Sequence, residues 1–250
     1  MPLLCTLLIA AVAPSTFFAG PAKVGDSVTY RISTTMSAAQ TAPDVSTIVL
    51  SWKAPAKFYA RLAASNAAPA LAVTRAADGQ LAPAAPDPSD PTAATIGTLL
   101  DQLNFPGHLA ATLDGSDHAQ TSLNVTPPAP ASSASPAPRP AAPVNVPLDV
   151  NLLGGESAVT IIAQGNSSQR GSSYGGRSSG AMGGWQSRRP ARSQGQSNGK
   201  APTVDIAMQA IFDRSGVLLH ATYRETFTAQ SPSGSQTVEH TITIDRTDAR

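Results

Sequence analysis

Glu225 and His240 come closer to a catalytic arrangement than any other residues of this sequence. Each interrupts an otherwise apolar face of a predicted strand, and the predicted register places the two directly opposite each other. A carboxylate beside an imidazole is the minimal pairing of an orienting group with a general base. No nucleophile or third partner accompanies them. We therefore interpret this polar pair as a cross-strand ion pair where the sheet face reaches solvent.

The remaining reactive residue types do not form a recognisable site. His108, His118 and His220 show no metal-ligand spacing, and two short aspartate clusters lack the closing glutamate of a calcium loop. Residues 171–175 match the nucleophile-elbow pattern, but they lie in a Gly/Ser tract where chance produces such matches. The sequence contains no P-loop, dinucleotide fingerprint or zinc spacing. We predict a non-enzyme with no metal and no cofactor.

A basic Gly/Ser/Arg-rich tract over 166–202 is the other candidate for chemistry. Residues 166–200 contain five Arg and one Lys but no acidic residue, so they carry +6 and leave −5 on the rest of the chain. Almost nothing in this tract can be buried, which predicts a disordered loop. A solvated linker is the favoured interpretation, and contact with an anionic cell-wall polymer is the alternative. The arginines that would make such contacts are Arg170, Arg177, Arg188, Arg189 and Arg192.

The elements that must position these residues are mostly strands. Alternation of apolar and polar residues with a period of two predicts half-buried antiparallel strands. The clearest alternating segments are 27–36, 45–53, 57–64, 144–152, 203–213 and 217–227. The last 48 residues predict a three-stranded meander in which Tyr223 lies opposite Ile242 and Phe227 opposite Val238. In that register every apolar pair faces the same side of the sheet.

Helical spacing is convincing in one segment. Asp90 can cap it, and four apolar residues follow at i, i+3, i+4 and i+7, from Ile96 to Leu103. Pro106 and the glycine after it predict the end of the helix after about three turns. We expect this helix to cover one face of the sheet. An apolar ligand pocket between helix and sheet would be lined by Trp52, Phe58, Leu99, Leu103 and Tyr223.

The composition agrees with an ordered domain that is interrupted by unstructured segments. Charged residues are 13% of the chain and there are 22 prolines, eight of them within 127–147. This predicts a Pro/Ala-rich linker over 127–143 in addition to the basic loop over 166–202. The predicted fold is mainly β (β-rich α+β). It is a curved antiparallel sheet or half-open barrel with one principal amphipathic helix and two long disordered insertions.

The N-terminus predicts export. Residues 3–13 are an uncharged apolar run, too short to span a bilayer but typical of a secretory signal core. We predict a signal peptide over 1–22 and a single domain over 23–250, with cleavage between Ala11 and Lys23. The alternative is a buried N-terminal helix. Cys5, the only cysteine, lies in the signal, so the mature chain would have no disulfide or thiolate site.

Residues 47–62, followed by the Asp-Gly turn at 78–79, resemble bacterial periplasmic lipoprotein carriers of the LolA type. The resemblance covers about 33 residues. It implies a strongly curved antiparallel sheet wrapped over helices, with an apolar cavity that accepts acyl chains. The sequence departs from that pattern at 80–83, where an aromatic residue usually follows the turn, and in the missing long N-terminal helix. No ligand-binding residues are carried over.

These observations together predict an exported, non-catalytic protein of the bacterial envelope, in the periplasm or outside the cell. It would hold an apolar ligand, such as a lipid or an acyl chain, between sheet and helix. The alternative is a surface or wall-associated structural protein whose basic loop contacts anionic polymers. Neither function requires a specific nucleic-acid site or a transmembrane segment in the mature chain.

Overall fold

The computed structural model of the chain describes residues 17–37, 42–63, 70–76, 79–85, 89–127, 142–155, 157–168, 202–231 and 234–248. Three predicted features lie mostly outside these residues. They are the apolar run of the signal, the Pro/Ala-rich linker over 127–143, and the basic loop over 166–202 with its five arginines. Within the described residues, no helix is long and apolar enough to cross a bilayer.

The described strands join one open antiparallel sheet, in the order β5-β4-β3-β2-β1-β11-β10-β9-β8-β7-β6. The strands are β1 (Ser27–Met36), β2 (Asp44–Ala54), β3 (Lys57–Leu62), β4 (Leu71–Arg75), β5 (Leu81–Pro83), β6 (His118–Val125), β7 (Val144–Gly154), β8 (Ala158–Asn166), β9 (Thr203–Asp213), β10 (Leu218–Ser231) and β11 (Gly234–Arg246). Most neighbours in the sheet are also neighbours in sequence. The exception is the central pair of β1 with β11, which joins the two ends of the domain.

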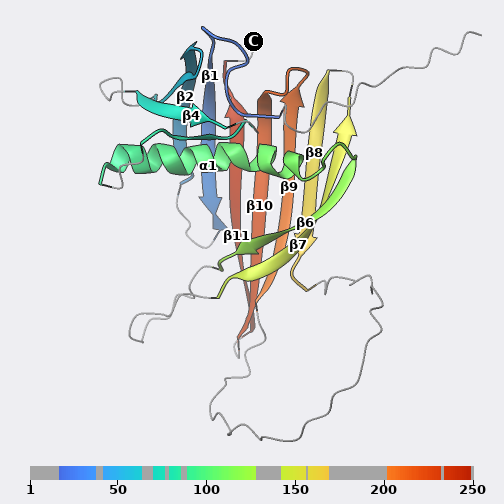
Figure 1. Cartoon of the computed structure of the whole chain (residues 1–250). Coiled ribbons are helices and arrows are strands. Elements are labelled where there is room, and N and C mark those ends of the chain that lie inside the picture. The colour runs from blue at the N-terminus through green and yellow to red at the C-terminus, as the bar shows by residue number, and fades with distance from the viewer. Residues whose placement is uncertain are drawn as a thin grey trace, which may run out of the picture.

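The helix α1 (Pro91–Ala111) lies across the concave face of this sheet (Figure 1). The two ends of the sheet bend toward the side on which α1 lies, so the sheet is curved but remains open between β5 and β6. The predicted fold class, a mainly β protein with a curved antiparallel sheet and one principal helix, is confirmed. The half-open barrel takes the form of a single open sheet.

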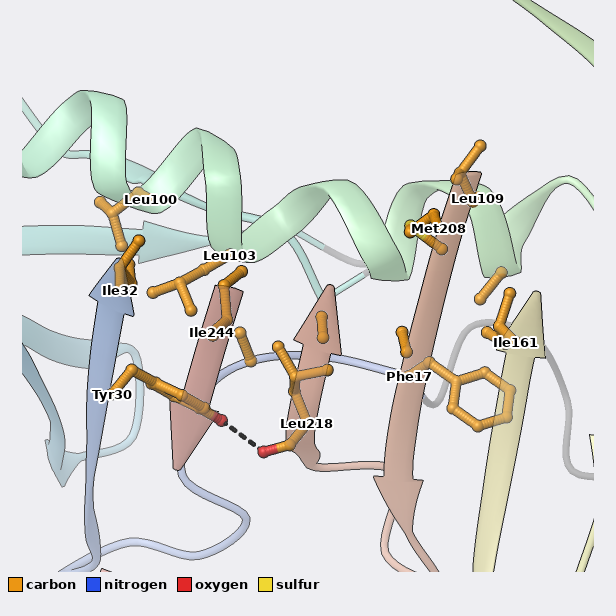
Figure 2. Close-up of a cluster of buried hydrophobic side chains, with 14 of the residues drawn as sticks. Phe17, Tyr30, Ile32, Leu100, Leu103, Leu109, Ile161, Met208, Leu218 and Ile244 are labelled. Carbon is orange, nitrogen blue, oxygen red and sulfur yellow. Dashed lines mark hydrogen bonds between the residues drawn. The ribbon is translucent and has the colours of Figure 1, made fainter. Parts of the chain in front are cut away.

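The core fills the space between α1 and the concave face, as Figure 2 shows for Leu100 and Leu103 above Ile32 and Ile244. Apolar residues at alternate strand positions supply the sheet side of the core, which is the reason for the period of two in the sequence. Tyr30 has no exposed surface, and its hydroxyl donates to the Leu218 carbonyl oxygen at 3.0 Å. Burial raises the pKa of Tyr30, so the phenol stays neutral and remains a donor.

The C-terminal end of α1 differs from the prediction. Asp90 caps the helix as expected, with its Oδ1 accepting the Thr92 N–H at 2.8 Å. The helix then continues through Pro106 to Ala111, so the predicted end at Pro106 was wrong. Leu109 is buried in this continuation, and its burial offsets the hydrogen bond that the proline cannot make. A local stop signal was overridden by tertiary packing.

The predicted meander register is confirmed, with Tyr223 opposite Ile242 and Phe227 opposite Val238. Because the strands from β6 to β9 alternate in direction, the two segments over 127–143 and 166–202 begin and end at the same rim of the sheet. The tight turns that follow β7 and β9 lie at the opposite rim.

Residues 17–21, at the start of the described chain, pack against the domain. The Phe18 N–H donates to the Gly216 carbonyl at 2.9 Å, and the Leu218 N–H donates to the Phe18 carbonyl at 3.0 Å. Four of the five residues are buried. The signal predicted over 1–22 overlaps this segment, and the signal itself stays a prediction.

Candidate functional site

A cavity of about 320 Å³ lies between one flank of α1 and the concave face of the sheet. The helix and four strands, β6, β9, β10 and β11, contribute its walls. The lining residues are Thr98, Asp101, Gln102, Phe105, Pro106, Leu123, Asn124, Val125, Met208, Ala221, Tyr223, Glu225, Ile242 and Ile244. Nine of these fourteen side chains are apolar or aromatic. A mostly apolar, concave lining with a few polar groups is typical of small-molecule binding sites.

Local sequence explains where the space comes from. Ala221 faces the concave side of β10 and pairs with Ala210 on β9, so the floor of the sheet carries small side chains at this point. Phe105 on α1 forms a wall instead, with its ring edge-on to Tyr223 and the ring centroids 5.1 Å apart. Small residues below and aromatic residues beside them leave a volume that the core does not fill.

One part of the lining is polar and is built around Glu225. The Tyr223 hydroxyl donates to Glu225 Oε1, and His240 Nδ1 lies 3.3 Å from Glu225 Oε2. The Glu225 side chain is 14% exposed and that of His240 is 23% exposed, so the pair is mostly withdrawn from water. Burial raises the pKa of Tyr223, and its hydrogen bond to Glu225 and the negative charge there raise it further. Tyr223 therefore stays a neutral donor to the carboxylate.

Two further polar side chains reach the cavity from α1. Gln102 Oε1 is enclosed, and it has no hydrogen-bond partner among the described residues. Asp101 precedes it and also lines the cavity. A buried acceptor without a donor is costly, and a group that supplies the donor recovers that cost.

The structure brings together only part of the predicted pocket. Tyr223 lines the cavity, but Leu99 and Leu103 are packed in the core beneath α1. Trp52 and Phe58 stack on each other in the β2–β3 hairpin, with ring centroids 4.8 Å apart, and do not line this cavity. Glu225 and His240 face each other as the register predicted, but beside the cavity and not on an open sheet face.

Sequence reasoning missed the helix flank that forms the cavity wall. Thr98, Gln102 and Phe105 follow one another at i, i+4 and i+7, with Asp101 at i+3, which is the spacing of a second stripe along α1. This stripe runs beside the apolar one from Ile96 to Leu103. The spacing was visible in the sequence. The mixture of polar and aromatic types concealed it, because a solvated helix flank has a similar composition.

The part of the chain that the structure describes shows neither a metal-binding group nor the predicted basic contacts at this cavity. Among the described residues, no group of three or more His, Cys, Asp or Glu side chains could hold a metal ion. The five arginines proposed to contact anionic polymers lie outside the described residues.

Comparison with solved structures gives a likeness at the level of the fold. No family model matches the chain, and no curated protein matches it. The chain is similar to the crystal structure of a LolA superfamily protein from Nitrosomonas europaea, at 12% identity. The match covers 94% of this chain and 88% of that one, with a TM-score of 0.24. This is a weak resemblance at the level of the fold.

Proposed function

We propose that this protein is a non-catalytic binding module that holds an apolar ligand, such as an acyl chain, in the cavity between α1 and the sheet. The observation that carries the proposal is the cavity itself, with its volume of about 320 Å³ and its mostly apolar lining. The cavity is partly open to solvent, and a partly open, mostly apolar concavity of this size is the usual form of a small-molecule site. In keeping with the apolar run at 3–13, we place the protein outside the cytoplasm.

The cavity volume limits the size of the ligand. A protein cavity of about 150 Å³ holds benzene, so 320 Å³ corresponds to roughly a dozen carbon atoms. A straight chain of about ten carbons would fill it, and burying that chain would supply the driving force for binding. Longer acyl chains would extend beyond the cavity walls.

The proposal is tested by isothermal titration calorimetry of the full chain with 1-decanol. We expect saturable binding of one decanol per chain. In the variant Thr98→Trp, an indole enters the cavity from α1, and we expect the affinity to fall by about tenfold or more. Thr98 is exposed at the helix surface, so this substitution should leave the folded state intact.

Ala94→Trp is the matched control, because Ala94 is exposed on the same helix but does not line the cavity. We expect its affinity for decanol to stay within about twofold of the parent chain. Absence of saturable binding would refute the proposal, and so would an equal effect of the two tryptophan variants.

A further inference from the structure

Both charged side chains that line the cavity are acidic. Asp101 and Glu225 each present a carboxylate, and Gln102 adds an enclosed carbonyl oxygen without a partner. Asn124 Oδ1 is already taken by the Asn145 side-chain amide at 3.0 Å. Among the described residues that line the cavity, none is Lys or Arg. This lining favours a donor and disfavours an anion.

Glu225 is held in place for a ligand and keeps accepting capacity. Each of its oxygens has one neighbour within the protein, Tyr223 on Oε1 and His240 on Oε2. A carboxylate offers about four lone-pair sites, so each oxygen can accept a further hydrogen bond. Both neighbours come from the same sheet face, and they fix the carboxylate without covering it. A fixed, partly desolvated anion attracts a donor cation more strongly than one in open water does.

The aromatic side chains that line the cavity also favour a cationic ligand. Phe105 and Tyr223 both line the cavity, and their rings contact each other edge to face. The face of an aromatic ring attracts ammonium groups through its quadrupole, while it gives no such attraction to an anion. His240 is the one basic side chain in contact with Glu225 in the described structure, and it does not line the cavity.

We propose that the ligand is an amphiphile with a cationic, hydrogen-bond-donating head, of the class of the long-chain alkylamines. This inference rests on the proposed function. Its chain occupies the apolar part of the cavity. Its ammonium group donates to Glu225 and is attracted by Asp101. Fatty acids and other anionic amphiphiles are excluded by the two carboxylates.

The test is calorimetric titration of the full chain at pH 7 with three ligands of equal chain length, decylamine, 1-decanol and decanoate. We expect decylamine to bind about tenfold more tightly than decanol, because charge-assisted hydrogen bonds are stronger than neutral ones, and decanoate to bind most weakly. Glu225→Gln should reduce the decylamine-to-decanol affinity ratio by at least fivefold, and Asp101→Asn should reduce it by a smaller factor.

Glu239→Gln is the matched control, since Glu239 lies on β11 next to His240 and carries the same charge but does not line the cavity. Its affinity ratio should match that of the parent chain. If decanoate binds as tightly as decylamine, or if the ratio is unchanged in both Glu225→Gln and Asp101→Asn, the head-group proposal is overturned while the cavity remains a binding site. If none of the three ligands binds, the proposed function itself fails.

Discussion

Gly165 is the residue of β8 at which the sheet has least room for a side chain. It faces the concave side opposite Leu148 of β7, and the buried Leu148 side chain covers the position. A Cβ at Gly165 would overlap the Pro147 carbonyl oxygen and lie 2.5 Å from Leu148 Cδ2. The glycine is therefore needed for the close approach of two strands.

We expect Gly165→Ala to lower the free energy of unfolding by about 2–3 kcal/mol. The added methyl group would push the Pro147 backbone and the Leu148 side chain away from β8. Urea denaturation measures this change. Gly154→Ala is the control, since Gly154 ends β7 and a Cβ there would meet nothing within 4 Å. The control should be neutral or slightly stabilising. Equal losses in both variants would contradict the close-approach argument.

At the scale of elements, residues 17–21 hold the C-terminal half of α1 against the sheet. Phe17 is 3% exposed, and its ring lies 4.9 Å from that of Phe212, centroid to centroid. On the helix side, a Cβ at Gly107 would come within 2.9 Å of the Phe17 carbonyl oxygen, so the glycine allows this close contact. The segment thus supports the part of α1 that continues beyond Pro106. If a signal is removed, cleavage before Phe17 keeps this packing and cleavage after Pro21 loses it.

Phe17→Ala should lower the free energy of unfolding by about 3–4 kcal/mol, the usual cost of removing a buried phenyl ring. Thermal and urea denaturation of the full chain measure the loss. Val24→Ala provides the comparison, because Val24 is 49% exposed a few residues later and should change stability by less than about 0.5 kcal/mol. A neutral Phe17→Ala variant would show that the segment adds no stability to the domain.

For the whole molecule, charge is divided between the basic tract and the rest of the chain. Residues 169–201 include all five arginines and the one lysine of that tract, so removing them changes the net charge from +1 to −5. Two hydrogen bonds join the end of β8 to β9 where this tract leaves the sheet, and neither of them involves a removed residue. The Ser167 N–H donates to the Val204 carbonyl at 2.9 Å, and the Val204 N–H donates to Ser167 Oγ at 2.8 Å.

We expect a chain in which a four-residue Gly/Ser linker replaces 169–201 to keep its melting temperature or gain slightly, because the closed loop is shorter. Binding of decanol should be retained. The parent chain should be held on immobilised heparin at low salt and released as salt rises, while the shortened chain passes through. Retention of the shortened chain would contradict a role of this tract in contacting anionic polymers.

Much of the fold follows from local pattern. The alternating faces predicted the strands, and the turn lengths between β9, β10 and β11 fixed the register that places Glu225 opposite His240. A shift by one residue would have turned every apolar side chain of a strand to the wrong face, so few registers were open. The site was less predictable. Of the five residues predicted for the pocket, Tyr223 lines the cavity, because a pocket depends on where packing leaves space and not on which residues are large and apolar.

The sequence by itself determined which segments are strands and which face of each is apolar. These properties depend on residues that are neighbours along the chain or are joined by short turns. The tertiary structure decided the pairing of β1 with β11, where Glu239 N–H donates to Ser37 Oγ across 202 positions of sequence. It also decided the length of α1 and the place of the cavity. Each of these depends on burial between distant segments, and such burial can outweigh local preferences like the stop signal at Pro106.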